Sequence, residues 1–337
     1  MRSKPRHRDL IPMPIPNDLR VEVLDMELHG SCNYKCVFCP QSQGREKEFL
    51  RRVSMETFEK TVDDAMQYGL KTVTLHGSGE PTLHSQFPDF VRAVKSRDLT
   101  CISFTNGLKL NEKLSEELID AGIDILRLSC IGYNRKTYER SMVRGKYDVV
   151  RENALRFCKM AEGTPTEMHM NHLIIDNEKI EHEVRMYKKN WGDYTGALQE
   201  IWMMHNWSGS DKIQTEYERE IRNKRSCGRP NAPLLQVRAG GLDGKSAAVV
   251  ACCMVLGKDS EGVLGHMSEQ TISEIVSGDA YTKLRDAHDR GAFDEIDYCK
   301  GCDQLYDTPE ALVWCNIEGR EYQQSKNLPS LNFGDYA

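Results

Sequence analysis

The sequence has no apolar run that approaches the length of a membrane-spanning helix. Its first 20 residues are basic and proline-rich but lack the apolar core of a secretory signal, so we interpret them as an extended tail. The 45 basic and 51 acidic residues are interspersed and give a formal net charge of −6, so no general affinity for nucleic acid is indicated. These absences predict a cytoplasmic protein that binds neither membranes nor nucleic acid.

The chain also lacks repeats and low-complexity segments, apart from a regular alternation of strand and helix signals up to about residue 205. Residues 54–69 have helical spacing, with Ser54 as the expected N-cap. Six strands are expected, over 21–28, 71–77, 99–107, 124–130, 166–175 and 197–205. Six βα units imply a parallel sheet but fall short of the eight units of a closed barrel, so we predict an open α/β partial barrel.

Three cysteines stand close together in HGSCNYKCVFCPQSQG, residues 29–44, after the first expected strand. Cys32, Cys36 and Cys39 are spaced C-x-x-x-C-x-x-C, and no fourth cysteine is near them. A structural zinc site normally has four protein ligands, and a disulfide framework needs even numbers. Three thiolates can hold a [4Fe–4S] cluster by three irons and leave the fourth iron open. From spacing alone, a partial zinc site is the alternative.

The motif and its place after the first strand resemble the radical S-adenosylmethionine (SAM) superfamily, in which the residue before the last cysteine is usually aromatic, here Phe38. The resemblance implies a (β/α)6 TIM-like partial barrel that binds SAM at the open iron. SAM would be cleaved to a 5′-deoxyadenosyl radical that abstracts a hydrogen atom from the substrate. It also implies an external electron donor such as flavodoxin or ferredoxin.

Later strand ends extend the resemblance. GSGEP, residues 77–81, resembles the family's GGEP motif. TNG stands at the end of the third strand and would place Asn106 near the ribose of SAM. LRLSCIG resembles the family's ribose-binding strand end, although Ile131 replaces its aspartate. In KTYERSMVRG an arginine would reach the SAM carboxylate, and we favour Arg140 over Arg144. The alternatives are a plain turn at GSGEP and surface charges in the helix. The cofactor contacts implied by the resemblance are Phe38, Gly77, Ser78, Gly79, Glu80, Asn106, Ser129, Arg140 and Arg144.

Six further cysteines lie beyond residue 212. A hairpin turning at LDGK, a helix and a C-x-x-C pair resemble the SPASM/twitch extension of radical SAM enzymes, and Thr308 stands where a full SPASM pattern has another cysteine. The resemblance implies one auxiliary [4Fe–4S] cluster, held by Cys227, Cys252, Cys299 and Cys302, with Cys253 competing with Cys252. A zinc ribbon built from the same four residues is the alternative. We therefore expect three regions: a tail (1–20), the barrel (21–212) and a small C-terminal iron–sulfur domain (213–337).

The sixth expected strand ends near His205, which is our candidate for acid–base catalysis or substrate contact. One expected function is oxidation of a small polar molecule, as in the aminocyclitol dehydrogenases, with the auxiliary cluster as electron acceptor. The other is modification of a ribosomally made peptide by thioether formation or epimerisation. Only about 20 residues precede the first strand, which leaves no space for a peptide-recognition domain and favours the small molecule. A non-enzymatic iron–sulfur or zinc scaffold is a third hypothesis.

Overall fold

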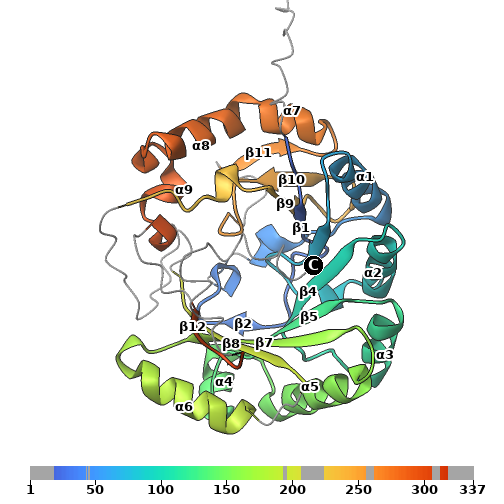
Figure 1. The fold of residues 1–337 in the computed structure, drawn as a ribbon, viewed down its shortest axis with the longest axis vertical. Helices are drawn as coiled ribbons and strands as arrows, with labels where there is room; N and C mark the ends of the chain where they lie inside the picture. Colours follow the sequence, from blue (N-terminus) through green and yellow to red (C-terminus); the bar gives the residue numbers. More distant parts are fainter. Residues whose placement is uncertain are drawn as a thin grey trace, which may run out of the picture.

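The computed structural model describes residues 19–42, 44, 46–192, 196–205, 224–255, 262–305 and 312–317. Six parallel strands lie side by side in chain order and form a curved sheet with its helices on the outside (Figure 1). They are β1 (Val23–Met26), β3 (Thr72–Leu75), β4 (Thr100–Thr105), β5 (Ile125–Ser129), β7 (Glu167–Ile174) and β8 (Leu198–Met203). The predicted partial barrel is thus confirmed.

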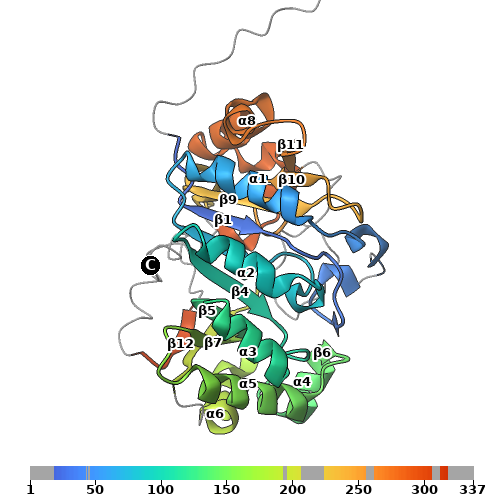
Figure 2. The same ribbon diagram turned by 90° about the vertical axis from the view of Figure 1, so that its right-hand side faces the viewer.

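Helices follow these strands and cover the outer face of the sheet, where α1, α2, α3 and α5 lie side by side (Figure 2). α1 begins as expected after Ser54, whose side chain accepts a hydrogen bond from the Thr57 N–H at 3.2 Å. The barrel helices are α1 (Met55–Met66), α2 (Phe87–Lys95), α3 (Glu112–Asp120), α4 (Arg135–Ser141), α5 (Tyr147–Ala161) and α6 (Ile180–Trp191). None of the described helices has the length and apolar character needed to cross a membrane.

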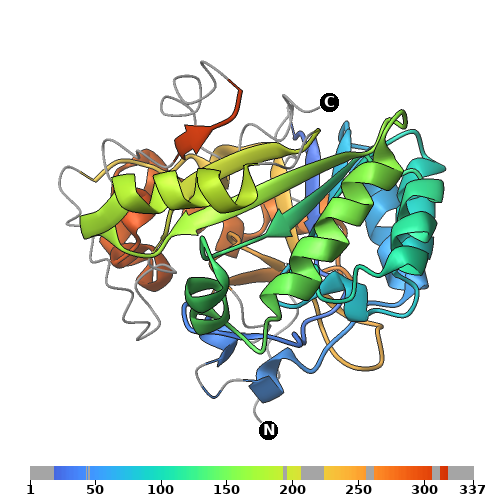
Figure 3. The same cartoon turned by 90° about the horizontal axis from the view of Figure 1, so that it is seen from below.

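The C-terminal region adds strands to both edges of this sheet. β9 (Leu234–Ala239) pairs in parallel with β1, and β10 (Ala247–Val250) and β11 (Val263–His266) continue it antiparallel. Seen from below, these orange strands lie beside the blue first strand (Figure 3). β12 (Leu312–Cys315) pairs with β8 at the opposite edge. The expected hairpin is present, and its strands are continuous with the barrel sheet.

Short helices complete the C-terminal region and several loops. α7 (Ile272–Ser277) and α8 (Asp279–Asp289) cover the added strands (Figure 1). α9 (Asp297–Lys300) carries Cys299, the first cysteine of the C-x-x-C pair, and Cys302 follows just after the helix. The described 3₁₀ turns are η1 (Pro40–Ser42), η2 (Glu46–Phe49), η3 (Pro81–Leu83), η4 (Asn177–Lys179), η6 (Arg229–Asn231), η7 (Phe293–Glu295) and η8 (Asp303–Leu305).

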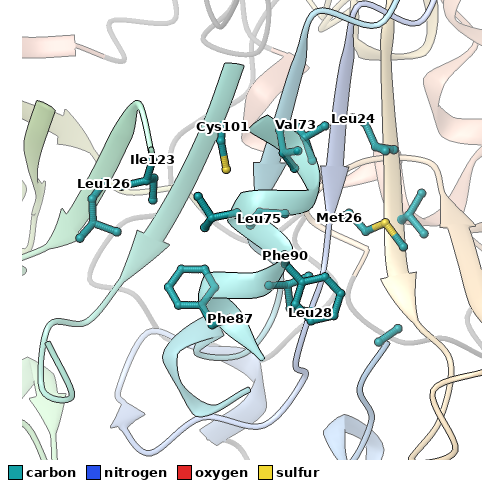
Figure 4. Packing of buried hydrophobic residues seen from close by; sticks show 14 of the residues in the cluster. Leu24, Met26, Leu28, Val73, Leu75, Phe87, Phe90, Cys101, Ile123 and Leu126 are labelled. Atoms are coloured by element: carbon teal, nitrogen blue, oxygen red, sulfur yellow. The ribbon is translucent and has the colours of Figure 1, made fainter. Parts of the chain in front are cut away.

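The two faces of the sheet differ in polarity. Outward-facing side chains of β1 and β3 pack against α2 in an apolar core that includes Leu24, Met26, Val73, Phe87 and Phe90 (Figure 4). Each such buried side chain contributes about 1.5–3 kcal/mol. Alternate residues on the inner face are polar yet buried; they include Asp25, Glu27, Thr74, Arg127, Gln236 and Arg238. Strands with apolar residues on both faces are usual in such sheets, so the polar inner face indicates a site rather than a plain core.

The chain between β5 and β7 forms two helices, α4 and α5, rather than one continuous helix. α4 ends at Ser141, and the next residues form β6 (Met142–Val143) before α5 begins. β6 pairs antiparallel with β2 (Lys35–Cys36), which lies inside the first cysteine motif. The interruption therefore places Met142 directly opposite Cys36 and fixes the cysteine loop to the barrel.

Candidate functional site

A cavity of about 330 Å³ opens at the carboxyl ends of the parallel strands. Cys32, Cys36 and Cys39 line one side of it, so the predicted loop does bring its three thiols to one space. This is the end of a parallel barrel at which α/β enzymes place their chemistry. Of the expected cofactor contacts, Phe38, Gly77, Gly79, Glu80, Asn106 and Ser129 line the same cavity.

The GSGEP segment touches the cysteine loop so closely that two of its positions have no space for a side chain. A Cβ on Gly79 would lie 2.1 Å from the His29 carbonyl oxygen, and one on Gly77 would lie 2.5 Å from Glu27. The Glu80 N–H donates to the Ser31 carbonyl at 3.0 Å. Glycine at both positions is therefore required by the close approach of the two loops.

Glu80 is held rigidly beside the first thiols. Its Oε1 accepts from the Thr82 and Thr105 hydroxyls, both at 2.7 Å, and its Oε2 accepts from the Asn106 N–H at 2.8 Å. Burial raises the pKa of Glu80, and these donors oppose the rise. A carboxylate has about four acceptor positions, so Oε2 keeps capacity for one more donor from the cavity. That capacity fits the role the resemblance implies, acceptance of a hydrogen bond from the SAM ammonium.

Ser78 is not among the residues that line the cavity, and its contact with the cofactor stays a prediction. Its hydroxyl accepts from Arg51 Nη2 at 3.1 Å, and its N–H donates to Glu27 Oε2 at 2.7 Å. Arg51 also donates from Nε and Nη2 to the two carboxylate oxygens of Glu27. Burial raises the pKa of Glu27, but Arg51, Arg238 and the Ser78 N–H more than offset this and lower it to about 2. The side chain of Ser78 thus completes a buried ion pair beneath the cavity.

Asn106 joins the third parallel strand to the cysteine loop, because its side-chain amide donates to Asn33 Oδ1 at 2.7 Å and faces Cys32 Sγ at 3.9 Å.

The two arginines expected to bind the SAM carboxylate are not part of the cavity lining. Arg140 and Arg144 are exposed, and neither is among the residues that line the cavity. Arg140 acts electrostatically on Asp176 and Arg144 on Glu46. Their contact with SAM stays a prediction from the resemblance.

The first three thiols fit a group that binds thiolates. Burial, and then Glu80, raises the pKa of Cys32 to about 12. Burial also raises the pKa of Cys36 well above its usual value, and the neighbouring Cys39 and Cys32 add to the rise. Protons on such thiols are displaced when a metal group binds. The Tyr34 N–H, 3.4 Å from Cys32 Sγ, is placed to donate to a bound thiolate.

The four C-terminal cysteines expected as auxiliary ligands meet in a second pocket, of about 20 Å³. Cys227, Cys252, Cys299 and Cys302 line it, together with Arg229 and His288. His288 Nε2 lies 3.5 Å from Cys299 Sγ. Burial raises the pKa of Cys252 to about 11 and that of Cys299 and Cys302 further. Four thiols around so small a space fit a closed set of ligands.

The two adjacent cysteines face opposite sides of their loop. Cys252 lines the auxiliary pocket, whereas Cys253 lines the larger cavity, and Met254 lines both. Arg229 Nη1 lies 2.7 Å from Cys253 Sγ. This placement supports Cys252 as the fourth auxiliary ligand. Cys315, on β12, is not among the residues that line either space.

Neither thiol set is arranged as a site for one ion. In the described ranges, no three His, Cys, Asp or Glu side chains converge closely enough to hold a single metal ion. A zinc ion would draw its sulfur ligands to about 2.3 Å from one point, whereas the thiolates of a four-iron cluster bind different irons and lie further apart. In the described residues, neither thiol set therefore forms a ready single-ion site of the zinc-ribbon kind.

Part of the cavity lining comes from the later part of the chain. We call His205, Arg238, Cys253 and Met254 the C-terminal wall; all four line the cavity. His205 was expected at this end of the barrel, and the tryptophan that follows two residues later lies outside the described residues. Arg238 and His76 were missed, and Cys253 was considered only as an alternative auxiliary ligand. The polar residues that alternate with Leu235 and Val237 in β9 were a signal for Arg238.

Comparison with known proteins agrees with this geometry. The model of the radical SAM superfamily matches residues 26–192, and that of an iron–sulfur cluster-binding domain, SPASM, matches residues 243–303. A probable GTP 3′,8-cyclase of Methanococcus maripaludis is 29% identical over 151 residues, 45% of this chain and 49% of the relative. A tungsten-containing aldehyde ferredoxin oxidoreductase cofactor-modifying protein of Pyrococcus furiosus is 33% identical over 110 residues, 32% and 30% of the two chains. The matches span at most about half of either relative.

Solved structures share the fold over most of the chain. BtrN in complex with AdoMet and 2-DOIA superposes with a TM-score of 0.56 at 19% identity, over 85% of this chain and 94% of BtrN. Streptococcus suis SuiB bound to precursor peptide SuiA gives a TM-score of 0.59 at 14% identity, over 87% and 72%. anSMEcpe with bound AdoMet and a Cp18Cys peptide gives 0.55 at 15%, over 93% and 98%. At these identities the likeness concerns the fold.

Two domain matches stand in the order that the cysteine motifs predicted; the second begins after Cys227 and contains the other three auxiliary cysteines. The first match implies SAM and a [4Fe–4S] cluster, and the second implies further iron–sulfur binding in the C-terminal region. Cys32, Cys36 and Cys39 remain the predicted ligands of the first cluster. The chain belongs to the radical SAM superfamily, in its SPASM/twitch group.

Proposed function

We propose that this radical SAM enzyme oxidises a hydroxylated carbon of a small polar molecule to a carbonyl. The observation that supports this most is the shared wall between the two sites. Cys252 lines the auxiliary pocket, Cys253 lines the cavity, and Met254 lines both. A substrate in the cavity would be separated from the auxiliary thiols by about one residue of chain, a short path for an electron.

When bound, SAM and the first cluster supply a 5′-deoxyadenosyl radical, and the auxiliary cluster supplies an electron acceptor. The substrate carbon loses a hydrogen atom, its hydroxyl loses a proton, and one electron leaves, which together give a two-electron oxidation. His205 lines the cavity at the end of β8 and is our candidate base for the hydroxyl proton. Glu80, Asn106 and Ser129 line the same cavity, where SAM would be held.

The dimensions of the cavity favour a small substrate. Its volume of about 330 Å³ is at the lower end of the range typical of small-molecule sites, roughly 300–1,000 Å³. Phe38, Phe104 and Met254 contribute apolar surface that would keep water from a radical. Reactive radicals benefit from such exclusion of water.

The test is isotope transfer in anaerobically reconstituted enzyme. A panel of carbon-deuterated polyols, aminocyclitols and sugar acids is incubated with SAM and reductant, and deuterium in 5′-deoxyadenosine identifies the molecule attacked. We expect a product two hydrogens lighter than the substrate. In Cys299→Ser/Cys302→Ser, we expect 5′-deoxyadenosine to form while the oxidised product disappears. The matched control is Cys158→Ser, which changes a half-buried thiol on α5 away from both sites.

Two results would contradict the proposal. One is a redox-neutral product, which would point to epimerisation or bond formation. The other is oxidised product from the Cys299→Ser/Cys302→Ser variant at the wild-type rate, because the auxiliary thiols would then have only a structural role. Deuterium transfer from a peptide panel and from no small molecule would favour the peptide-modifying alternative.

A further inference from the structure

Arg238 is a buried cation that the radical chemistry does not use. It lies on β9, its residue is 1% exposed, and it lines the cavity as part of the C-terminal wall. On the neighbouring strand β10, the residue paired with Arg238 is Ala248, whose short side chain does not cover the guanidinium. The guanidinium therefore belongs to the inner, polar face of the sheet, beside the space where the substrate would lie.

The hydrogen bonds of Arg238 leave part of its donor capacity unused. Nε donates to the Val255 carbonyl at 3.4 Å, and Nη2 donates to the Cys253 carbonyl at 3.1 Å. Nη1 is buried and has no hydrogen-bond partner. A guanidinium carries five N–H donors, and a buried charge is costly unless it is paired. Two backbone carbonyls supply no formal counter-charge, so Arg238 keeps an unpaired N–H group that suits an anionic acceptor.

The nearest carboxylate does not balance this charge. Glu27 acts electrostatically on Arg238, but both of its oxygens already accept from Arg51, and one also accepts from the Ser78 N–H. Glu27 and Arg51 are each 0% exposed. Two guanidinium groups thus share one carboxylate, and no ion pair joins Arg238 to another acid in the described part of the chain.

A second C-terminal arginine serves the auxiliary thiols. Arg229 Nη1 lies 2.7 Å from Cys253 Sγ, and Arg229 lines the auxiliary pocket. Its charge opposes the burial that raises the pKa of Cys227 and Cys252. Arg238 lines the cavity and not the auxiliary pocket. Arg229 therefore lines the auxiliary pocket, whereas Arg238 lines the cavity in which the substrate would bind.

We propose that Arg238 binds an anionic oxygen group of the substrate, a carboxylate or a phosphate. Such groups accept two parallel hydrogen bonds from a guanidinium and supply the missing charge. The proposal rests on the cavity being the substrate site, as proposed above, and it narrows the substrate to a hydroxylated acid or phosphate ester. Its anion would sit against β9, beside Arg238, in the cavity that Glu80 and Asn106 also line.

The experiment titrates small anions into the full-length holoenzyme with both clusters and SAM bound. Acetate and inorganic phosphate are the probes, acetamide is the neutral control, and ionic strength is constant. Binding is read from isothermal titration and from the electron paramagnetic resonance signal of the reduced clusters. The wild type should bind one or both anions saturably and ignore acetamide. The anion bound more tightly distinguishes a carboxylate site from a phosphate site.

The variants decide whether Arg238 is responsible. Arg238→Met should weaken anion binding by about tenfold or more, as expected for loss of a charge-assisted hydrogen bond. Arg238→Lys keeps the positive charge and should lose less anion affinity. This variant also keeps the test valid if Arg238→Met does not fold. Arg92→Met removes an arginine that is 50% exposed on α2 and should bind anions like the wild type.

Three results would overturn the proposal. The wild type could bind neither anion at constant ionic strength, or both Arg238 variants could bind anions as the wild type does. Alternatively, SAM affinity in the same preparations could fall as much as anion affinity, which would assign Arg238 to the SAM carboxylate. Anion binding requires no turnover, so these results are independent of the isotope-transfer test of the oxidation itself.

Discussion

The two cysteine sites of this protein are built in opposite ways. The first takes three thiols from one loop of eight residues, Cys32 to Cys39, and lines a cavity of about 330 Å³. The second takes four thiols from three distant stretches of chain and encloses about 20 Å³. A cluster in the first site would keep an open iron facing a ligand space, whereas a cluster in the second would be closed by protein.

This difference fits a division between reaction and electron transfer. In the open site, a SAM-binding cluster would lie beside Glu80 and Asn106, which line the same cavity as the three thiols. The closed site has no position for a ligand, but one of its loops forms the cavity wall at Cys253 and Met254. The predictions below test this division, in order of expected effect.

Removal of the open site should abolish activity. We expect Cys32→Ala/Cys36→Ala/Cys39→Ala to lose SAM cleavage entirely and to retain about four of about eight irons. Chromatographic assay of 5′-deoxyadenosine and colorimetric iron analysis measure both. Persistent cleavage would contradict the assignment of the open site.

The closed site should depend on one of two adjacent cysteines. Cys252→Ser should lose about four irons, whereas Cys253→Ser should keep about eight, because only Cys252 lines the auxiliary pocket. Iron analysis and Mössbauer spectra of the two variants give the comparison. The reverse pattern would mean that Cys253 is the ligand and Cys252 the cavity residue.

The open site also depends on the ion pair beneath it. Glu27→Gln leaves the Arg51 guanidinium buried without its counter-charge, and breaking a buried pair costs about 3–5 kcal/mol of unfolding free energy. Denaturant unfolding at neutral pH measures the loss. Glu59→Gln on α1, whose side chain is 45% exposed and 3.7 Å from Arg97, is the control and should cost about 0–1 kcal/mol.

The pH dependence of the Glu27 effect follows from its pKa, which folding lowers from 4.5 to about 2. A lowered pKa stabilises the fold above the unfolded-state value and ceases to do so as the pH falls through the folded-state value. The stability gap between wild type and Glu27→Gln should therefore be full above pH 4.5 and shrink towards pH 2. A gap that grows in acid would contradict this account.

The smallest expected effect concerns the cation of the closed site. Arg229→Met removes a positive charge beside the auxiliary thiols, which makes reduction of a cluster there less favourable. We expect a potential on the order of 50–100 mV more negative. Redox titration followed by electron paramagnetic resonance measures it, with the exposed Arg290→Met as control. An unchanged potential would mean that Arg229 acts only on Cys253.

Short-range patterns were sufficient for much of the fold and for the thiols that line the first cavity. The strand and helix order, the N-cap at Ser54, the three-cysteine loop and the cavity contacts at Glu80 and Asn106 all follow from local spacing and motifs. These features are encoded within a few residues of each other. The helix break at Met142 was missed, because it depends on pairing with Cys36 more than 100 positions earlier.

By itself, the sequence determined the superfamily, the partial barrel and the identities of the thiols, because cysteine spacing and βα periodicity are local properties of the chain. The tertiary structure alone decided which of Cys252 and Cys253 faces the auxiliary pocket, that Arg140 and Arg144 lie outside the cavity lining, and that Arg238 lies within it. The physical reason is strand register. β9 joins the sheet beside β1, about 200 residues away in sequence, and only that pairing turns Arg238 inward next to Glu27.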